Sequence, residues 1–465
     1  MVYGGIQLRR HAASPSLPRL PDLSIQPKAI GDRLRERDAA ARDDPRSVTV
    51  VGPLCLAYHA DMVYDMAEQC YAVAEALDPP GWQWPYYRAL AESARGSGGA
   101  LAAGMRKVVV LAPDFGPAWW RLGEAEFKEG RYDAAAEAWR RARSLPEPDR
   151  TPPAGTPVHL ASAPLSGYAA LGLARLALAQ GDPDGARQIL EPLSAGAPAF
   201  GPAFRLLGES YARLGRAADT ARVVSHANRQ AAYAPYADPM IDRLARESRN
   251  STFLLQQAAS ADLADNAPWK EYLLMRALEF DPANPAVVYE LASVLRNLGR
   301  NAEALDLFLR YAQLVPDDYQ GLGQIGSCLA DLGRFTEAEA FLRRALELVD
   351  DATTHYDLGF VLTRLGRTRE AVAEYERALE RDPSHIKART NLAVNLFDLG
   401  QVERASRELT RVLSIDPENA GAHTNLGAVL VHQGQVERAI REFQEALRID
   451  PQQAQARTAL EVLGR

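Results

Sequence analysis

Five hydrogen-bonding side chains recur at a nearly constant spacing in the second half of the chain. They are Glu290, Gln324, Asp357, Asn391 and Asn425, separated by 34, 33, 34 and 34 residues. A row of such side chains could pair with the backbone of an extended peptide while reading little of its side-chain sequence. The alternative is a row of solvated surface residues, since exposed polar side chains are the surface norm.

The motifs that carry catalysis or phosphate binding are missing from the sequence. GxxxxGK[ST], HExxH and GxSxG do not occur. Residues 321–326 match GxGxxG, but no strand pattern precedes them and Gly326 already has a packing role in a helix. The eight histidines are scattered. We therefore expect no enzymatic activity, no cofactor and no metal site.

Composition narrows the choice of partner and compartment. A net charge of -7 gives no reason to expect nucleic-acid binding. No apolar run is long enough to span a membrane. Residues 1–27 contain no apolar run typical of a signal peptide, so the expected location is the cytoplasm. A periplasmic or envelope location stays open if a leader is missing from this start.

Prolines divide the chain into units of 34 residues. Pro383, Pro417 and Pro451 keep this spacing, as do Pro282 and Pro316. The units share a pattern of large and small apolar residues whose clearest copy is Leu426, Gly427, Leu430, Gly434, Ala439, Phe443, Ala446 and Pro451. A period of this length is the signature of a stacked helical array.

Each residue type that recurs in the pattern has a structural role within a pair of helices. Small residues such as Gly427 let two helix backbones approach, and Gly434 supplies the left-handed stop between the helices. The proline of the Asp450-Pro451 step prevents the second helix from continuing. The sequence therefore predicts helix–turn–helix units throughout.

These units resemble the tetratricopeptide repeat family over about residues 47 to 451, with nine clear copies among about eleven. The resemblance implies an all-α, right-handed superhelical solenoid of about eleven antiparallel helix pairs. The first helix of each pair then lines a concave groove that receives a protein or peptide segment. TNLAVNL (390–396) and HTNLGAVL (423–430) are similar to the asparagine-ladder repeats of O-linked N-acetylglucosamine transferase, whose catalytic domain does not follow here.

Aromatic residues also fall on the positions that this resemblance assigns to the groove. Tyr289 and Tyr356 directly precede two of the polar residues and are expected to bind peptide with them. In the first half, Tyr86, Tyr87 and Trp120 are expected to form an inward patch suited to apolar or proline-rich anchors. Core packing is the alternative for all three.

Two departures from the 34-residue spacing divide the array into blocks. The boundaries expected are a disordered segment 1–27, a capping helix 28–46, repeat blocks 47–146, 166–230 and 252–451, a proline-rich insertion 147–165, an insertion 231–251 with an extra helix, and a capping helix 452–465. Each insertion is either a functional loop or a joint between solenoid segments. The short C-terminal helix leaves self-association through that end possible.

Cysteine usage gives a weak indication of compartment. Cys55, Cys70 and Cys328 are too few for a disulfide framework. Cys55 and Cys70 lie on the two helices of one unit, where either a bridge or two small packing residues would fit, and we expect packing residues.

Together these observations predict a non-catalytic scaffold or adaptor that binds an extended protein segment in its concave groove. Two alternatives remain open. The chain could be a regulatory or substrate-recruiting subunit for a separately encoded enzyme such as a glycosyltransferase, or a cell-envelope assembly factor.

Overall fold

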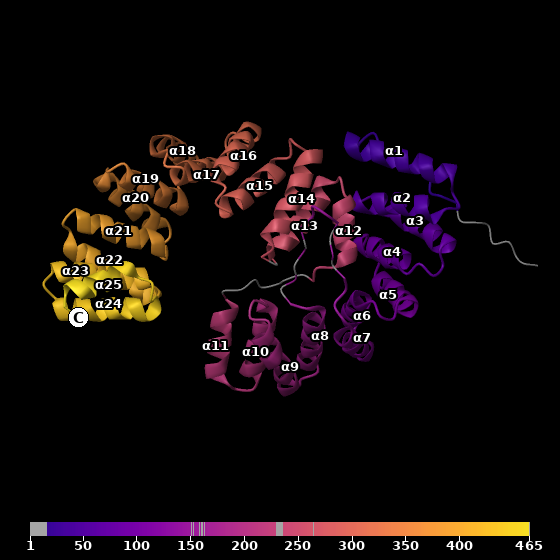
Figure 1. The fold of residues 1–465 in the computed structure, drawn as a ribbon, viewed down its shortest axis with the longest axis horizontal. Coiled ribbons are helices and arrows are strands. Elements are labelled where there is room, and N and C mark those ends of the chain that lie inside the picture. The colour runs from indigo at the N-terminus through magenta and orange to yellow at the C-terminus, as the bar shows by residue number, and fades with distance from the viewer. Residues whose placement is uncertain are drawn as a thin grey trace, which may run out of the picture. The chain divides into compact units, whose positions relative to one another are not determined.

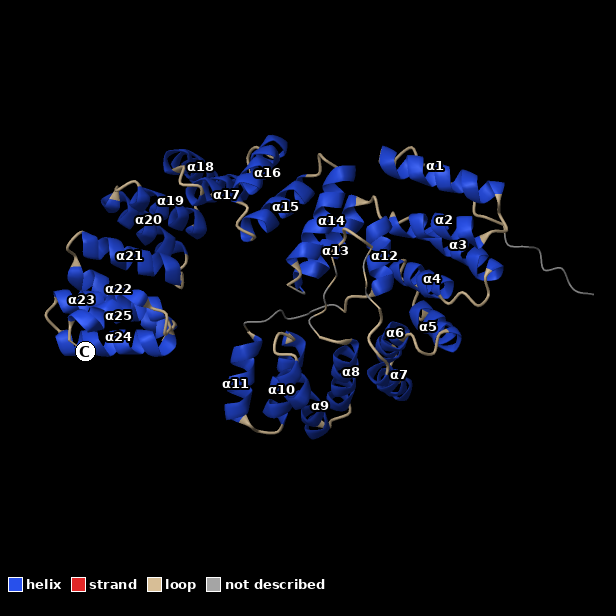
Figure 2. Ribbon diagram, in the orientation of Figure 1, coloured by secondary structure: helices blue, strands red, loops and turns tan. Residues whose placement is uncertain are grey.

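Helices and their connecting turns make up the described part of the chain in this computed structural model, which covers residues 16–149, 151, 153–157, 159, 161, 163–228, 236–263 and 265–464. Within those ranges there are twenty-five helices and no strand (Figure 1). The secondary-structure view shows the same succession of helices joined by loops (Figure 2). The chain divides into two compact units, Met1–Val287 and Val288–Arg465.

The first unit contains six helix pairs and two single helices. The single helices are α1 (Lys28–Asp43) and α12 (Pro239–Glu247). The pairs are α2 (Val48–Ala60) with α3 (Tyr64–Leu77), α4 (Gln83–Ala94) with α5 (Ala100–Leu111), α6 (Gly116–Lys128) with α7 (Tyr132–Ser144), α8 (Leu165–Ala179) with α9 (Pro183–Gly196), α10 (Gly201–Arg213) with α11 (Ala217–Ala227), and α13 (Ser251–Leu263) with α14 (Ala267–Phe280).

The remaining five pairs form the second unit, apart from the first residues of α15. They are α15 (Pro285–Asn297) with α16 (Asn301–Leu314), α17 (Tyr319–Asp331) with α18 (Phe335–Leu348), α19 (Ala352–Arg364) with α20 (Thr368–Arg381), α21 (Ile386–Asp398) with α22 (Val402–Ile415), and α23 (Ala420–His432) with α24 (Val436–Ile449). The single helix α25 (Ala454–Val462) follows. The expected all-α array of about eleven pairs is thus confirmed.

Close approach of the two helices in a pair explains the small residues of the repeat pattern. A Cβ atom built on Gly427 would lie 2.6 Å from the Phe443 ring, so any larger residue would force the ring to move. Gly434, in the turn that follows, has a φ of 73°, a left-handed conformation that costs little without a side chain. Packing and turn geometry therefore both fix glycine in this unit.

In the last two repeats, a polar contact at one repeat position ties the first helix to its second helix and to the preceding turn. His423 Nδ1 lies 2.7 Å from Glu442 on α24, and its Nε2 lies 3.0 Å from the carbonyl oxygen of Pro417. One unit earlier, Arg389 donates to Glu408 and to the carbonyl oxygen of Pro383, each at 2.6 Å. Histidine and arginine thus place nitrogen atoms against the same two acceptors; arginine always donates to both, and histidine donates to both when it is protonated.

This equivalence predicts different outcomes for two substitutions at one site. His423→Ala removes both contacts and is expected to destabilise the second unit by about 1 kcal/mol. His423→Arg is expected to keep most of that stability, since Arg389 makes the same contacts one repeat earlier. Urea unfolding followed by circular dichroism measures both. An arginine variant as unstable as the alanine variant would contradict the equivalence.

Cys55 and Cys70 form a disulfide that joins α2 to α3. The expectation of two unbonded packing residues is therefore corrected. The helices bring the two Cα atoms to 5.2 Å, a separation that a disulfide spans. Cys328, by contrast, is a buried free thiol.

Candidate functional site

The five polar residues of the sequence pattern occupy one position on successive first helices of the second unit. Each side chain is partly buried, which fits a position along the wall of a groove. The residues are Glu290 on α15, Gln324 on α17, Asp357 on α19, Asn391 on α21 and Asn425 on α23.

A cavity of about 450 Å³ opens between α15, α17 and α19 and brings four of the expected binding residues together. Gln324 and Asp357 line it together with Tyr289 and Tyr356. Each tyrosine directly precedes one of the five polar residues, which we call the ladder. Its wall includes further residues that the sequence did not single out: Arg296, Tyr319, Ser327, His385 and Lys387. Ser327 and Lys387 occupy repeat positions that the family geometry assigns to the groove. Their place in the repeat was therefore enough to predict them as groove residues.

Hydrogen bonds hold the polar side chains of this cavity in place. Arg296 Nη1 donates to Gln324 Oε1 at 2.8 Å, and Gln324 is also hydrogen-bonded to Tyr289. Ser327 Oγ donates to Asp357 Oδ2 at 2.5 Å. Contacts between neighbouring first helices thus orient the wall of the groove.

Burial dominates the electrostatics of the cavity. It raises the pKa of Asp357 because the charged carboxylate loses solvent, although Ser327 and Arg296 act in the opposite direction. Burial also raises the pKa of Tyr289 and Tyr356. Both phenols are therefore neutral hydrogen-bonding groups near neutral pH.

The other three polar residues lie outside this cavity. Asn391 is hydrogen-bonded to Tyr356 and Tyr375, so it borders the cavity without lining it. Asn425 lines a separate, small hollow beside Phe397. Glu290 is absent from the lining of both. The five residues therefore share one repeat position on successive helices, but they do not line a single cavity.

In the first unit, the expected aromatic patch is covered by the chain itself. Tyr86 and Tyr87 on α4 are fully buried. The Tyr86 hydroxyl donates to Asp238 at 2.5 Å, and the Tyr87 hydroxyl donates to the carbonyl oxygen of Met240 at 3.3 Å. The Trp120 ring on α6 faces Tyr236 at a centroid distance of 5.1 Å.

The covering segment is residues 236–250, which we call the inner strap. It contains α12 and belongs to the second insertion of the sequence. Because it occupies the face formed by α4 and α6, the prediction that Tyr86, Tyr87 and Trp120 bind an external partner is corrected for the chain as folded. The alternative of structural aromatics describes them better.

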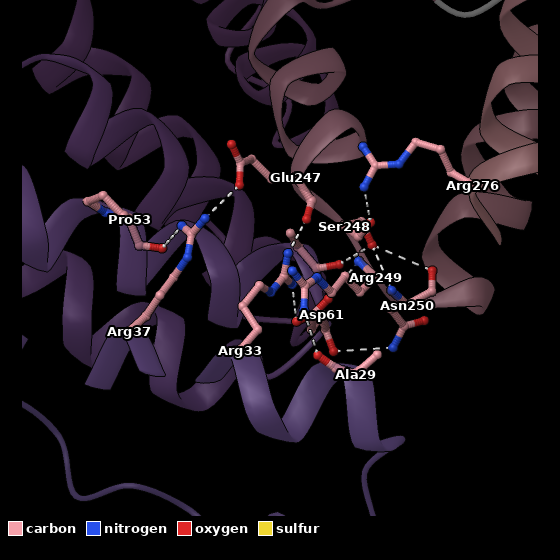
Figure 3. A network of polar contacts seen from close by, with 11 residues as sticks. Ala29, Arg33, Arg37, Pro53, Asp61, Glu247, Ser248, Arg249, Asn250 and Arg276 are labelled. Carbon is pink, nitrogen blue, oxygen red and sulfur yellow. Dashed lines mark hydrogen bonds and ion pairs between the residues drawn. The ribbon is translucent and has the colours of Figure 1, made fainter. Parts of the chain in front are cut away.

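The end of the inner strap is held by a cluster of polar contacts with α1 and the end of α2 (Figure 3). Arg33 pairs with Asp61 and also donates to the carbonyl oxygen of Glu247. Asp61 Oδ1 in turn accepts from the backbone N–H of Arg249 at 3.0 Å. Arg33 and Asp61 are both buried, so they depend on one another for compensation of charge.

The first insertion contacts the inner strap as well. His159 Nδ1 lies 2.7 Å from Asp242 on α12, and the His159 ring stacks on Trp269 of α14 at a centroid distance of 5.6 Å. Residues 150, 152, 158, 160, 162 and 229–235 of the two insertions lie outside the described residues. In the described part, the first insertion contacts the rest of the first unit through the buried His159, whereas residues 153–155 are exposed.

The C-terminal helix α25 buries Ala456 and Leu460 against the last pair, while Val462 is 81% exposed. An apolar hollow of about 540 Å³ lies between α25 and residues of α23 and α24. Self-association through this end stays a prediction.

Family comparisons agree with the repeated architecture. Tetratricopeptide repeat models match residues 167–192, 271–319, 317–384, 362–413 and 390–454. Residues 167–192 and 271–454 are thus recognised as tetratricopeptide repeats. The matched stretches include all five ladder positions, so the ladder lies on the first helices of recognised repeats.

Several solved structures align with this chain at low sequence identity. The APC/C hetero-tetramer Cut9–Hcn1 is 14% identical, with 93% of each chain covered and a TM-score of 0.43. PilW, described as a widely conserved type IV pilus biogenesis factor, is 20% identical over 45% of this chain and 98% of its own, with a TM-score of 0.43. YrrB, described as having an unusual peptide-binding site, is 22% identical over 40% of this chain and 97% of its own, with a TM-score of 0.35.

No curated protein is significantly similar to the chain. Within the described residues, no helix combines the length and apolar character needed to cross a membrane. The same part of the chain holds no cluster of three or more His, Cys, Asp or Glu side chains arranged for a metal ion.

Proposed function

We propose that this protein is a non-catalytic interaction scaffold whose second unit binds an extended segment of a partner protein. The observation that carries the proposal is the cavity between α15, α17 and α19, into which Tyr289, Gln324, Tyr356 and Asp357 all project. Amide, carboxylate and phenol groups can pair with the N–H and C=O groups of an extended backbone. Asn391 and Asn425 extend the same row of hydrogen-bonding groups along α21 and α23.

The double substitution Asn391→Ala with Asn425→Ala tests the row beyond the cavity. Losing two hydrogen bonds to the ligand is expected to weaken peptide binding roughly tenfold or more. The probe is a fluorescent pool of randomised nonapeptides, with binding measured by anisotropy. The variant is expected to fold, with a loss of about 1 kcal/mol because Asn391 also bonds the buried Tyr375.

A matched control replaces two amides that lie on second helices, Gln313→Ala with Gln444→Ala. Both side chains are exposed. This variant is expected to bind the pool as the unmodified protein does. Equal binding by the asparagine variant and this control would contradict the ladder.

A second candidate function, cell-envelope assembly, is favoured by the disulfide between Cys55 and Cys70. Disulfides persist in oxidising compartments, whereas a cytoplasmic location predicts reduced thiols. Thiol labelling of protein taken directly from cells, with alkylation before lysis, tests this candidate. Labelling of both cysteines in the denatured protein would count against it.

A further inference from the structure

The cavity in the second unit has a carboxylate among aromatic rings. Asp357 lines it together with Tyr289, Tyr319 and Tyr356. Tyr356 is further flanked by His385, whose ring lies 4.9 Å from the Tyr356 ring. Aromatic faces carry negative charge density and attract cations, and a carboxylate adds a full negative charge.

The Asp357 carboxylate has little compensation from the protein. Among the described residues, Ser327 is its hydrogen-bond donor, and it reaches only Oδ2. The charge of Arg296 favours the ionised Asp357, but the Arg296 guanidinium donates to Gln324 and lies 3.5 Å from Asp331. The raised pKa of Asp357 reflects the same shortage, because burial penalises its charge more than these neighbours favour it.

The remaining charges of the cavity do not fill this need. Asp351 is itself a carboxylate and so cannot act as a counter-ion; it caps α19, where it accepts from the Thr354 N–H at 2.9 Å. Lys387 is exposed at the rim, so its ammonium group keeps its water. A cation that enters from outside can therefore approach Asp357 without displacing a counter-ion of the protein.

We propose that this cavity receives the basic side chain, lysine or arginine, of the extended segment bound by the second unit. The inference rests on the proposed function, since the backbone of that segment is held by the ladder. The aliphatic stem of the side chain lies along the tyrosine rings, and its charged end donates to Asp357. The ladder gives affinity for an extended chain, and Asp357 selects which residue occupies one position.

The test compares five pools of fluorescent nonapeptides, randomised except for a central Lys, Arg, Gln, Leu or Glu. We expect the Lys and Arg pools to bind the full chain roughly ten- to a hundredfold tighter than the others, the range for hydrogen bonds to charged groups. Asp357→Asn is expected to abolish this preference, so that within this variant the Lys and Arg pools bind no more tightly than the Gln pool.

Asp306→Asn is the charge-matched control. Asp306 is exposed on the second helix α16 and lies outside the cavity lining. The Asp306→Asn variant loses the same charge as Asp357→Asn and is expected to retain the preference for the Lys and Arg pools. A loss of preference in both variants would assign the effect to the overall charge and overturn the assignment to Asp357.

Folding of the Asp357→Asn variant is checked by thermal unfolding. Because the folded state raises the pKa of Asp357, the ionised carboxylate costs stability above its unfolded pKa, and asparagine removes that cost. The unfolding midpoint is therefore expected to equal or exceed that of the unmodified protein at neutral pH. If the variant does not fold, Tyr319→Leu replaces it, with a several-fold weaker preference expected from the loss of one aromatic face.

The possible outcomes separate the inference from the function on which it rests. One outcome is that all five pools bind the unmodified protein equally well and all bind the Asn391→Ala, Asn425→Ala variant more weakly. This result would overturn the basic-side-chain site and leave the ladder intact. Failure of every pool to bind would overturn both. A preference for Lys and Arg that survives Asp357→Asn would overturn the role of Asp357.

Discussion

Asp238→Ala is expected to lower the free energy of unfolding of the first unit by about 3 kcal/mol, because it removes a buried anion and leaves Arg121, whose side chain is 19% exposed, without its partner. Arg121 Nε lies 2.5 Å from Asp238 Oδ2, and the Asp238 side chain is 1% exposed. The same carboxylate accepts from the Tyr86 hydroxyl and from the N–H of Met240 at the start of α12. One substitution thus removes both polar side-chain contacts through which Asp238 joins the inner strap to α4 and α6.

Tryptophan fluorescence measures this loss selectively. All six tryptophans of the chain lie in the first unit, at positions 82, 84, 119, 120, 139 and 269. Urea unfolding followed by this signal therefore reports the first unit without interference from the second. Circular dichroism, which reports both, is expected to show a second transition that the substitution leaves unchanged.

Two control variants separate charge from general perturbation. Asp238→Asn keeps an acceptor for Tyr86 and is expected to cost less than alanine. Asp133→Ala, at an exposed site on α7, is expected to change stability by no more than about 0.5 kcal/mol. If Asp238→Ala costs as little as Asp133→Ala, the inner strap is not anchored through this carboxylate.

Asp61→Ala has a comparable expected effect at the other end of the inner strap, about 3–5 kcal/mol. Arg33 is 4% exposed and pairs with Asp61, so the guanidinium would remain buried without an anion. The backbone N–H of Arg249 would lose its acceptor as well (Figure 3). Tryptophan-detected urea unfolding again measures the change.

The neighbouring pair of Arg37 and Glu247 supplies the control. These side chains are 27% and 39% exposed, with 3.0 Å between Arg37 Nη2 and Glu247 Oε2. Because solvent screens such a pair, Glu247→Ala is expected to cost less than about 1 kcal/mol. A similar cost for Asp61→Ala and Glu247→Ala would show that burial of the Arg33 pair contributes little.

Combining Asp238→Ala with Asp61→Ala asks whether the inner strap docks as one body. If it does, the first substitution already releases much of what the second would disturb, and the combined loss falls short of the sum. Additive losses would indicate that the two ends dock independently.

Local sequence was sufficient to predict the helix pairs. The 34-residue period, Gly427 against Phe443 and the left-handed Gly434 depend on residues within one repeat, so one repeat contains the information for its own fold. The polar row of Gln324, Asp357 and their counterparts was predictable for the same reason. Its position in the repeat fixes the helix face on which it lies.

The cavity around Asp357 could not be predicted from the sequence of any single repeat. Tyr319 and Ser327 belong to the repeat before that of Asp357, and His385 begins the repeat after it, so only the stacking of repeats brings them to one carboxylate. Their distances depend on the rotation between neighbouring repeats, which no single repeat encodes.

The first unit shows the strongest contribution of tertiary structure. The aromatic residues there occupy the repeat positions expected to line an open groove. However, the Tyr86 hydroxyl donates to Asp238, which lies 152 residues away in the sequence. The insertion breaks the repeat period, so periodicity predicts where it begins and ends but not where it packs. The sequence by itself determined the repeats and the faces of their helices. The tertiary structure decided which of those faces stays open, because burial depends on contacts between segments far apart in the chain.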